Sequence, residues 1–152
     1  MRIIIADLKR TEKIAQNLAE KILSAGWRKK AKDAVVIGLE GELGGGKTTF
    51  AQFFAKALGI KEKIQSPTFV IQKIYKLYGS PTSVKFRHFI HIDAYRIKNF
   101  KELLALGWKE IISAPQNIVL VEWADRVKKI LPQKRVQIKF KVVDDKTRRI
   151  TI

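Results

Sequence analysis

Two elements of different periodicity flank a glycine-rich segment in the first third of the chain. Residues 34–39 (AVVIGL) form an apolar run of the length typical of a buried strand. Residues 47–58 carry their apolar side chains at helical spacing, and Gly59 follows where a C-terminal cap belongs. The pattern therefore predicts a strand, a glycine-rich loop and a helix in direct succession.

A strand and a helix precede this unit. Residues 2–6 predict a short strand, and residues 11–27 predict a helix because apolar side chains recur there at three- and four-residue steps. We expect Gly26 and the lysine-rich segment after it to end this helix and to form a loop.

The middle of the chain predicts a β-hairpin. Residues 69–78 and 86–93 each alternate loosely between apolar and polar side chains, and residues 79–83 (GSPTS) between them have the composition of a turn. A short helix is expected next, because residues 99–102 begin with Asn and end with Glu, the spacing of a helix start, and Gly107 follows as a stop signal.

The last third of the chain predicts one buried strand and a closing hairpin. Residues 117–122 are four apolar residues between an asparagine and a glutamate, and a run that is apolar on both faces belongs in the middle of a sheet. Residues 123–130 predict a helical turn or two that ends near Pro132. Residues 135–143 and 147–152 then pair as a hairpin.

The glycine-rich segment fits a phosphate-binding pattern. Residues 41–48 (GELGGGKT) match G-x-x-x-x-G-K-S/T, between a strand and a helix as that pattern requires. Glycines let backbone N–H groups approach a triphosphate, Lys47 can reach its β and γ phosphates, and the Thr48 hydroxyl can bind Mg²⁺. A glycine-rich turn with a chance lysine is the alternative, and the flanking elements argue against it.

Two carboxylates end predicted strands and are candidate partners of this loop. Glu122 ends the buried run, at the edge where open α/β sheets bind ligands, so it is the candidate for holding Mg²⁺ through its water shell. Asp93 ends the second strand of the central hairpin. Either could instead cap a neighbouring loop, but a phosphate loop needs an acidic partner.

A turn and two histidines carry weaker signals. Pro67 places Ser66 and Thr68 in a turn shortly after the glycine-rich loop, where two hydroxyls could sense a γ-phosphate and Mg²⁺. An ordinary turn is the alternative. His88 and His91 lie three apart on a strand-like segment, which places them on opposite faces, so we do not expect a histidine metal site.

Composition bounds the class of protein. The 152 residues are enough for one domain with a real core, which we expect to span 1–152, and no apolar run is long enough for a membrane helix. The chain has no cysteine, so disulfides are excluded. Its 31 Lys and Arg against 14 Asp and Glu give a net charge of +17, which favours a polyanionic partner, although a solvated basic surface is the alternative.

Five blocks together resemble the TsaE (YjeE) family in order and spacing over essentially the whole chain. They are 41–49 (GELGGGKTT), 66–69 (SPTF), 91–96 (HIDAYR), 102–107 (ELLALG) and 122–123 (EW). The resemblance implies a three-layer P-loop NTPase-like fold with a central mixed sheet flanked by helices and a C-terminal β-hairpin. It also implies a cytoplasmic ATPase that acts with the TsaB–TsaD complex to form threonylcarbamoyladenosine beside the anticodon of tRNAs.

The resemblance further implies roles for single residues. Nucleotide binding is implied for Gly44, Gly45, Gly46, Lys47, Thr48 and Thr49, and for Thr11 and Arg148 near the adenine. Thr48 and Glu122 match the Mg²⁺ ligands, Asp93 matches a carboxylate needed for hydrolysis, and Thr68 lies in the switch-like loop. Departures from the family pattern are Glu42 for aspartate, Gly45 for alanine and Ala124 for proline.

We expect a Mg²⁺-dependent ATPase that is slow alone and faster with its partners, in which Lys47, Asp93, Glu122 and Thr68 serve the reaction. Arg96 could reach the site, or a partner could complete it. Tyr95, Arg96 and Trp123 are candidates for a docking face because aromatic and arginine side chains suit interface hot spots, while core packing explains Trp123 equally well.

Two other classes of protein stay open. A small-molecule kinase would use the same loop but needs a substrate pocket and a lid, for which the chain leaves little material. A nucleotide-regulated nucleic-acid-binding module would rely on the +17 charge, with tRNA contacted directly or through the partner complex.

Overall fold

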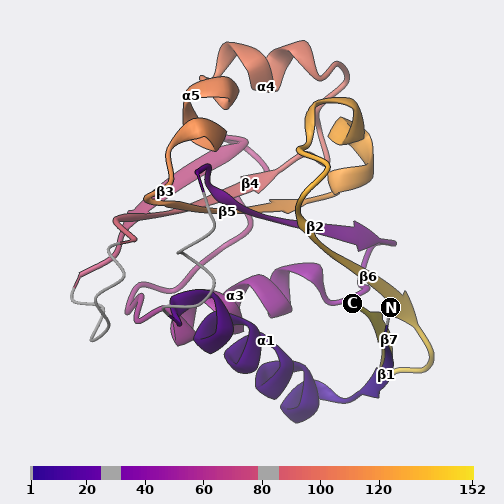
Figure 1. The fold of residues 1–152 in the computed structure, drawn as a ribbon. Coiled ribbons are helices and arrows are strands. Elements are labelled where there is room, and N and C mark those ends of the chain that lie inside the picture. Colours follow the sequence, from indigo (N-terminus) through magenta and orange to yellow (C-terminus); the bar gives the residue numbers. More distant parts are fainter. Residues whose placement is uncertain (1, 25–31, 79–85) are drawn as a thin grey trace.

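A seven-stranded mixed sheet is the centre of the computed structural model, which describes residues 2–24, 32–78 and 86–152 (Figure 1). Its strands are β1 (Ile3–Ala6), β2 (Val35–Gly41), β3 (Gln72–Lys76), β4 (His88–Asp93), β5 (Asn117–Glu122), β6 (Val136–Val142) and β7 (Arg148–Thr151). They are ordered β1-β7-β6-β2-β5-β4-β3. Strands β6, β2, β5 and β4 are parallel, whereas β1, β7 and β3 pair antiparallel with their neighbours, so the mixed sheet and the C-terminal hairpin are confirmed.

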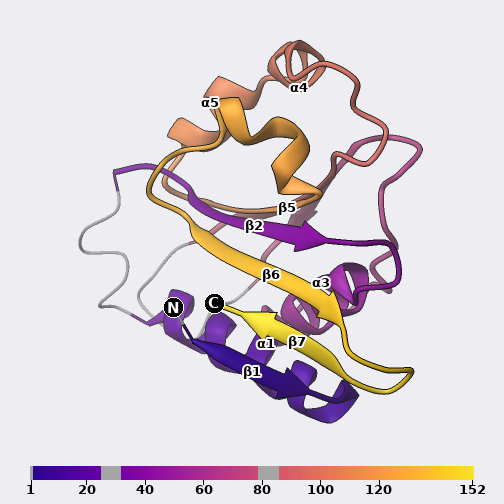
Figure 2. The same cartoon turned by 90° about the vertical axis from the view of Figure 1, so that its right-hand side faces the viewer.

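Helices cover both faces of this sheet (Figures 1 and 2). Helices α1 (Leu8–Leu23) and α3 (Lys47–Ala57) lie on one face. Helices α4 (Lys101–Ala105) and α5 (Trp108–Ser113) and the 3-10 helix η1 (Ala124–Ile130) lie on the other. Each face is apolar and has to be buried against a second layer, and the result is the three-layer α/β fold that was predicted.

Strand β5 is buried on both faces, as its apolar run predicts. Ile118 and Leu120 pack on the side of α1 and α3, whereas Val119 and Val121 pack on the side of α4, α5 and η1. The strand lies between β2 and β4 in parallel register. Because parallel strands end at the same edge of a sheet, the acidic residues that end β4 and β5 lie side by side.

Helix α1 begins and ends earlier than predicted. It starts three residues earlier because the carboxylate of Asp7 caps it by accepting a hydrogen bond from the Arg10 N–H at 2.7 Å. It ends four residues earlier, at Leu23. Gly26, which was predicted to end the helix, lies outside the described residues, as does most of the predicted lysine-rich loop.

Strand β3 is shorter than predicted. It begins at Gln72, whereas Phe69 and the residue after it lie in a turn, with Phe69 84% exposed. Ile71, just before the strand, has φ +62°, a left-handed conformation that strand geometry does not allow. The pairing of β3 with β4 confirms the predicted hairpin, while its turn at 79–83 lies outside the described residues.

The second helical layer contains one predicted helix and one that was missed. Asn99 and Glu102 each accept a backbone hydrogen bond at 2.9 Å, as the predicted pattern requires, but α4 begins one residue later than predicted, with Phe100 in place of Asn99 as its N-cap. Gly107, at φ +81°, separates α4 from α5, which sequence periodicity did not predict. Buried Trp108 of α5 donates its indole N–H to the carbonyl of Ile130 in η1 at 2.9 Å. None of the helices in the described part of the chain is long and apolar enough to cross a membrane.

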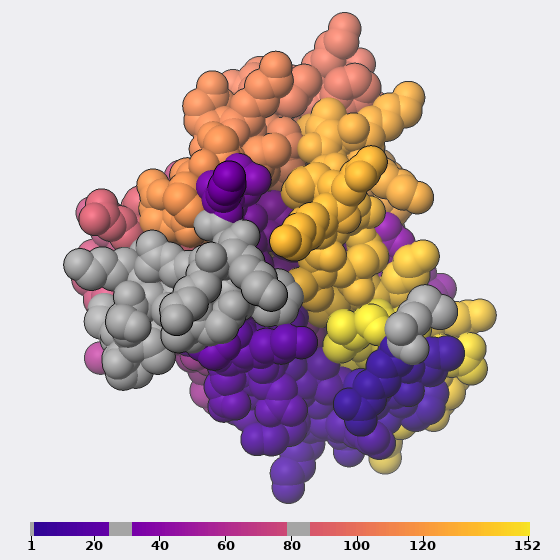
Figure 3. All heavy atoms as spheres, in the orientation of Figure 1, coloured from indigo at the N-terminus to yellow at the C-terminus, as the bar shows by residue number. Residues whose placement is uncertain are grey.

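The two ends of the chain meet at one side of the molecule. The N–H of Arg2 donates to the carbonyl of Ile152 at 2.7 Å, and the N–H of Ile152 donates back at 3.0 Å. In the space-filling view the indigo N-terminal segment lies beside the yellow C-terminal segment (Figure 3). Strands β1 and β7 are therefore held together, and residues from both ends of the chain can build one site.

Candidate nucleotide site

The glycine-rich loop connects the end of β2 to the first residue of α3. Gly44 and Gly46 have φ values of +73° and +97°, which side-chain-bearing residues rarely adopt. A Cβ on Gly45 would lie 2.9 Å from the carbonyl oxygen of Glu42. The three glycines thus let the backbone fold tightly ahead of a helix N-terminus, where amide groups and the helix dipole favour an anion.

Lys47 is held inside this loop. Its Nζ donates to the carbonyls of Gly41 and Glu42 at 2.7 Å each and lies 3.7 Å from the ring centroid of Trp123. The residue is only 4% exposed. Burial lowers the pKa of the Lys47 ammonium from its ordinary value, and the nearby carboxylates, Glu122 foremost, oppose that shift. The loop therefore positions a buried cation at the N-terminal end of α3.

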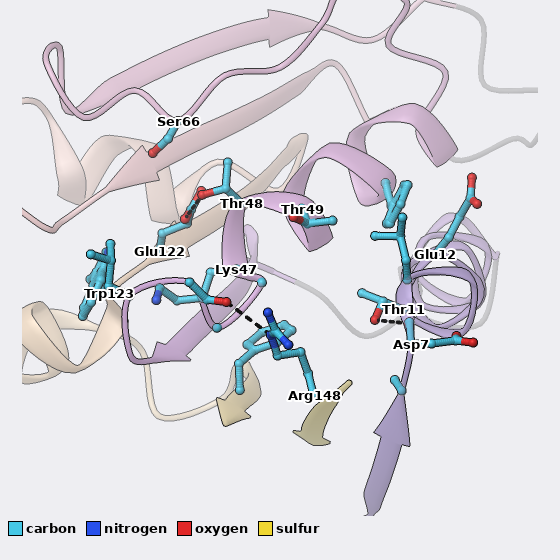
Figure 4. A pocket seen from close by; sticks show the side chains of 18 of the residues that line it. Asp7, Thr11, Glu12, Lys47, Thr48, Thr49, Ser66, Glu122, Trp123 and Arg148 are labelled. Atoms are coloured by element: carbon cyan, nitrogen blue, oxygen red, sulfur yellow. Dashed lines mark hydrogen bonds between the residues drawn. The ribbon is translucent and has the colours of Figure 1, made fainter. Parts of the chain in front are cut away.

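Thr48 and Glu122 join the loop to the end of β5. The Thr48 hydroxyl donates to Glu122 Oε2 at 2.8 Å across 74 residues of sequence, and Figure 4 shows the two side chains pointing toward each other. The other oxygen of this carboxylate, Oε1, lies 2.8 Å from Nε2 of His91. Glu122 is almost fully buried, so both oxygens are held by specific partners rather than by water.

Asp93 is held by the turn at Ser66 to Thr68, which follows α3. Its Oδ2 accepts hydrogen bonds from the hydroxyls of Ser66 and Thr68, the second at 2.9 Å. Its Oδ1 accepts the N–H of Tyr95 at 2.8 Å. The turn predicted at Ser66 to Thr68 is thus tied to the end of β4, and the predicted site residues Asp93 and Thr68 are in direct contact.

Two buried carboxylates at this edge favour a cation. Asp93 and Glu122 are directly opposite each other in the parallel register of β4 and β5, and like charges so placed repel. Lys47 is one cation near them. The described residues contain no group of three or more His, Cys, Asp or Glu side chains that could hold a metal. The oxygens of Thr48 and Glu122 nevertheless fit Mg²⁺, which commonly takes one or two protein ligands beside water and substrate phosphates.

These residues line one cleft of about 1130 Å³, large enough for a nucleotide. Figure 4 shows Glu122, Trp123 and Ser66 at one side of it and Asp7, Thr11 and Glu12 at the other. The predicted site residues that line it are Thr11, Gly44, Gly45, Gly46, Lys47, Thr48, Thr49, Thr68, Asp93, Tyr95, Glu122, Trp123 and Arg148. Arg96 is the one predicted residue outside this lining.

Thr11 and Arg148 line the cleft from the first helix and from the C-terminal hairpin. The Thr11 hydroxyl donates to the carbonyl of Asp7 at 2.7 Å, and Arg148 donates through Nε to the carbonyl of Gly44 at 3.2 Å. Arg148 also donates through Nη1 to the carbonyl of Asp144 at 2.7 Å. The first helix and the C-terminal hairpin therefore both contribute to the wall of the cleft, and the hairpin contacts the glycine-rich loop directly.

The three residues predicted for docking divide into two groups. The rings of Tyr95 and Trp123 are in contact, with centroids 4.9 Å apart and a tilt of 45°, and the guanidinium of Arg126 lies 5.2 Å and 5.7 Å from them. Trp123 has φ +58°, an uncommon conformation directly after Glu122. The Arg96 guanidinium instead lies 4.5 Å from the ring of Phe69. Tyr95 is 39% exposed and lies at the rim of the cleft.

Sequence reasoning missed the part that His91 plays in this site. The sequence prediction asked only whether His88 and His91 could form a metal site together. It did not ask which other side chain His91 could contact. Alternation also places His91 on the same face as Asp93, two residues later, and that pattern could have drawn attention to it.

A strand, a glycine-rich loop and a helix, set beside a parallel strand that ends in an acid, define a P-loop-like α/β domain. The chain belongs to the TsaE family: the model of the family described as threonylcarbamoyl adenosine biosynthesis protein TsaE matches residues 5–150. The protein of that name from Bacillus subtilis is 42% identical over 121 residues, which cover 80% of this chain and 70% of that protein.

Two further comparisons agree with this assignment. The protein named TsaE from Rickettsia prowazekii is 33% identical over 145 residues, which cover 95% of this chain and 88% of that protein. The crystal structure of YdiB from Bacillus subtilis superposes with a TM-score of 0.67 at 32% identity, covering 98% of this chain and 83% of that one. The family resemblance and the α/β fold expected from the sequence are thereby confirmed.

Proposed function

We propose that the cleft binds ATP with Mg²⁺ and hydrolyses it, and that the chain is the ATPase of tRNA threonylcarbamoyladenosine formation, acting with the TsaB–TsaD complex in the cytoplasm. Family membership supports the pathway. The contact between Thr48 and Glu122 is the observation that carries the chemistry, because it brings the hydroxyl of the glycine-rich loop to an acid at the sheet edge.

The residues of the cleft suit a reaction driven by positioning and charge neutralisation. Mg²⁺, held by Thr48 and Glu122 when bound, would neutralise charge on the β and γ phosphates. The loop amides and the Lys47 ammonium bind the same phosphates. Asp93 accepts a hydrogen bond from the attacking water and orients it. This bond replaces one of the two that Asp93 accepts from the hydroxyls of Ser66 and Thr68.

Slow hydrolysis by the isolated chain follows from the position of the arginines. Arg148 lines the cleft beside the glycine-rich loop, but its guanidinium already donates to the carbonyls of Gly44, Asp144 and Thr147. Arg96 lies against Phe69. We propose that a partner completes the site, docking on the face formed by Tyr95, Arg96 and Trp123, so that ATP turnover rises in the presence of TsaB and TsaD. Equal rates with and without them would contradict this.

The decisive experiment pairs calorimetry with reconstitution of tRNA modification. We expect the wild-type chain to bind ATP with Mg²⁺, and Lys47→Ala to lose at least tenfold in affinity and to abolish modification. Lys109→Ala, on the exposed side of α5 and far from the cleft, is the matched control that leaves both unchanged. No affinity of the folded wild-type chain for adenine nucleotides, with or without the partners, refutes the proposal.

The same preparation separates an ATPase from a small-molecule kinase. With ATP labelled at the γ-phosphate, we expect the label to appear as free phosphate and not on an acceptor. Transfer of label to a small molecule would assign the cleft to a kinase.

A further inference from the structure

A fully buried histidine lies behind the candidate metal ligand. His91, on β4, has an exposed fraction of 0%, and its Nε2 is 2.8 Å from Oε1 of Glu122 on β5. In the strand register His91 is opposite Leu120, so its ring reaches diagonally toward the C-terminal edge of the sheet to meet the carboxylate. His91 does not itself line the cleft, but it lies behind Glu122, which does.

Packing alone does not account for an imidazole at this position. The ring is stacked near Phe89, with centroids 6.2 Å apart, in a region of otherwise apolar side chains. Its Nδ1 is buried and has no hydrogen-bond partner among the residues that the structure describes. Burying a polar atom without a partner is unfavourable, and a leucine or phenylalanine would fill the space without that cost. The hydrogen bond between the His91 side chain and Glu122 is therefore the feature that explains an imidazole here.

That contact fixes the orientation of the Glu122 carboxylate. A carboxylate oxygen only accepts hydrogen bonds, so His91 donates through Nε2–H. Oε1 is held by His91, and Oε2 is held by the Thr48 hydroxyl. With one donor on each oxygen, the carboxylate plane is defined before any ligand arrives.

We propose that His91 is a positioning residue, which sets the affinity for Mg²⁺ by holding Glu122 with one oxygen toward Thr48. The inference rests on the proposed function, since it concerns how the chain holds Mg²⁺ with ATP. Partners behind a metal ligand typically change metal affinity by ten- to a hundredfold when removed. His91→Leu should therefore weaken Mg²⁺ binding by about that factor, while metal-free ATP, held by the loop amides, is little affected.

The experiment measures two affinities for each variant by calorimetry: Mg²⁺ for the protein–ATP complex, and ATP in excess chelator. His91→Leu is compared with His91→Gln, whose amide can donate from nearly the position of Nε2. We expect the leucine variant to lose Mg²⁺ affinity about tenfold to a hundredfold, with metal-free ATP affinity within twofold, and the glutamine variant to recover most of the loss. An unchanged Mg²⁺ affinity overturns the inference, as does a parallel loss of both affinities, which is the mark of a merely structural role.

His88→Gln is the matched control. His88 lies at the other end of the same strand, where its Nδ1 is 3.2 Å from the side-chain oxygen of Asn117. This variant should bind both Mg²⁺ and ATP as the wild type does, because His88 has no contact with the cleft. A loss of Mg²⁺ affinity in His88→Gln equal to that in His91→Leu overturns the assignment to His91.

A measurement on the wild-type chain covers the case in which His91→Leu does not fold. Nitrogen-15 NMR of the imidazole should show the tautomer protonated on Nε2, and adding Mg²⁺ to the ATP complex should shift the Nε2 resonance of His91 and not that of His88. Insensitivity of the His91 resonance to Mg²⁺ overturns the inference. Failure of the wild-type chain to bind ATP at all would instead defeat the proposed function, so the two outcomes are distinguishable.

Discussion

Gly46 shows at the residue scale why the loop needs glycine. Its φ of +97° comes immediately before the first residue of α3. Gly46→Ala should therefore cost about 1–3 kcal/mol of unfolding free energy, or shift the loop and lose nucleotide affinity more than tenfold. Urea unfolding and calorimetry measure the two effects.

Gly59 provides the control for that substitution. It has a similar φ of +87° with open space around its Cα, and it lies at the far end of α3. Gly59→Ala should lose comparable stability but keep full nucleotide affinity. Gly46→Ala that binds ATP as tightly as the wild type would show that the loop backbone does not grip the phosphates.

Asp93 carries a second prediction at this scale. Asp93→Asn keeps an oxygen for the Tyr95 N–H but removes the charge and the second acceptor that orients water. We expect single-turnover ATP hydrolysis to fall by roughly 10²- to 10⁴-fold, the range of a lost general base, with ATP affinity changed only a few-fold. An active Asp93→Asn variant would leave the orienting role to Glu122 alone.

The residues of the site could be predicted where strand topology brings them together. Glu122 and Asp93 end predicted strands, and parallel pairing places such ends at one edge beside the glycine-rich loop. The contact of His91 with Glu122 could not be predicted in the same way, because it depends on the register between β4 and β5. Alternation identifies the face on which a side chain lies and leaves its partner open.

At the scale of elements, helix α1 depends on its first residues. The Asp7 side chain accepts the Arg10 N–H, and the Asp7 carbonyl accepts the Thr11 hydroxyl of the cleft. Asp7→Ala should cost about 1 kcal/mol of unfolding free energy, while Asp7→Asn, also a good cap, should cost much less. Chemical denaturation distinguishes them, and equal losses in the two variants would argue against the cap.

The turn of the C-terminal hairpin should respond to pH. The Thr147 hydroxyl, first, and the Lys146 N–H lower the pKa of Asp144 by donating to its carboxylate. A lowered aspartate pKa contributes stability that is present above the ordinary value of about 3.9 and is lost as pH falls through the lowered one. Thr147→Val should raise the pKa of Asp144, which carboxyl NMR titration measures. An unshifted titration would assign the effect to the backbone donors.

The predicted start of β3 was wrong because a contact between residues far apart in the sequence overrides the local pattern. The alternation that predicts a strand from Phe69 is present, yet Thr68 is bonded to Asp93 and Ile71 turns the chain at φ +62°. Strand β3 therefore begins at Gln72. The bond between Thr68 and Asp93 spans 25 residues, so no local window contains it.

At the scale of the whole molecule, the cleft is assembled from both ends of the chain and its centre. Thr11 follows β1, Arg148 begins β7, and these strands pair directly, which brings the first helix and the last hairpin to the same side of the glycine-rich loop. Lys47 and Glu122 come from the central parallel strands and their connection. A nucleotide in this cleft would therefore bridge segments that meet only in the folded chain, so its binding should stabilise the fold as a whole.

Two of the basic residues that contribute to the net charge of +17 face each other on the C-terminal hairpin. Lys141 and Arg149 are directly opposite each other on β6 and β7, and neither forms an ion pair with any residue that the structure describes. Like charges in that arrangement destabilise a sheet, so Lys141→Glu should raise the free energy of unfolding. The native sequence thus keeps two opposed like charges that lower its stability. Such a pair is expected on a surface that binds a polyanion.

Binding of tRNA tests whether this surface meets phosphate. We expect the wild-type chain to bind tRNA with an affinity that falls steeply with salt, because each neutralised phosphate releases counterions, and the slope of log K against log salt to become shallower in Lys141→Glu. Lys109→Glu, which makes the same charge change on α5, should lower the affinity less and keep the slope. If tRNA binds only when the partner proteins are present, and with the same slope in both variants, the positive charge of the hairpin serves docking or solubility and the RNA is contacted elsewhere in the complex.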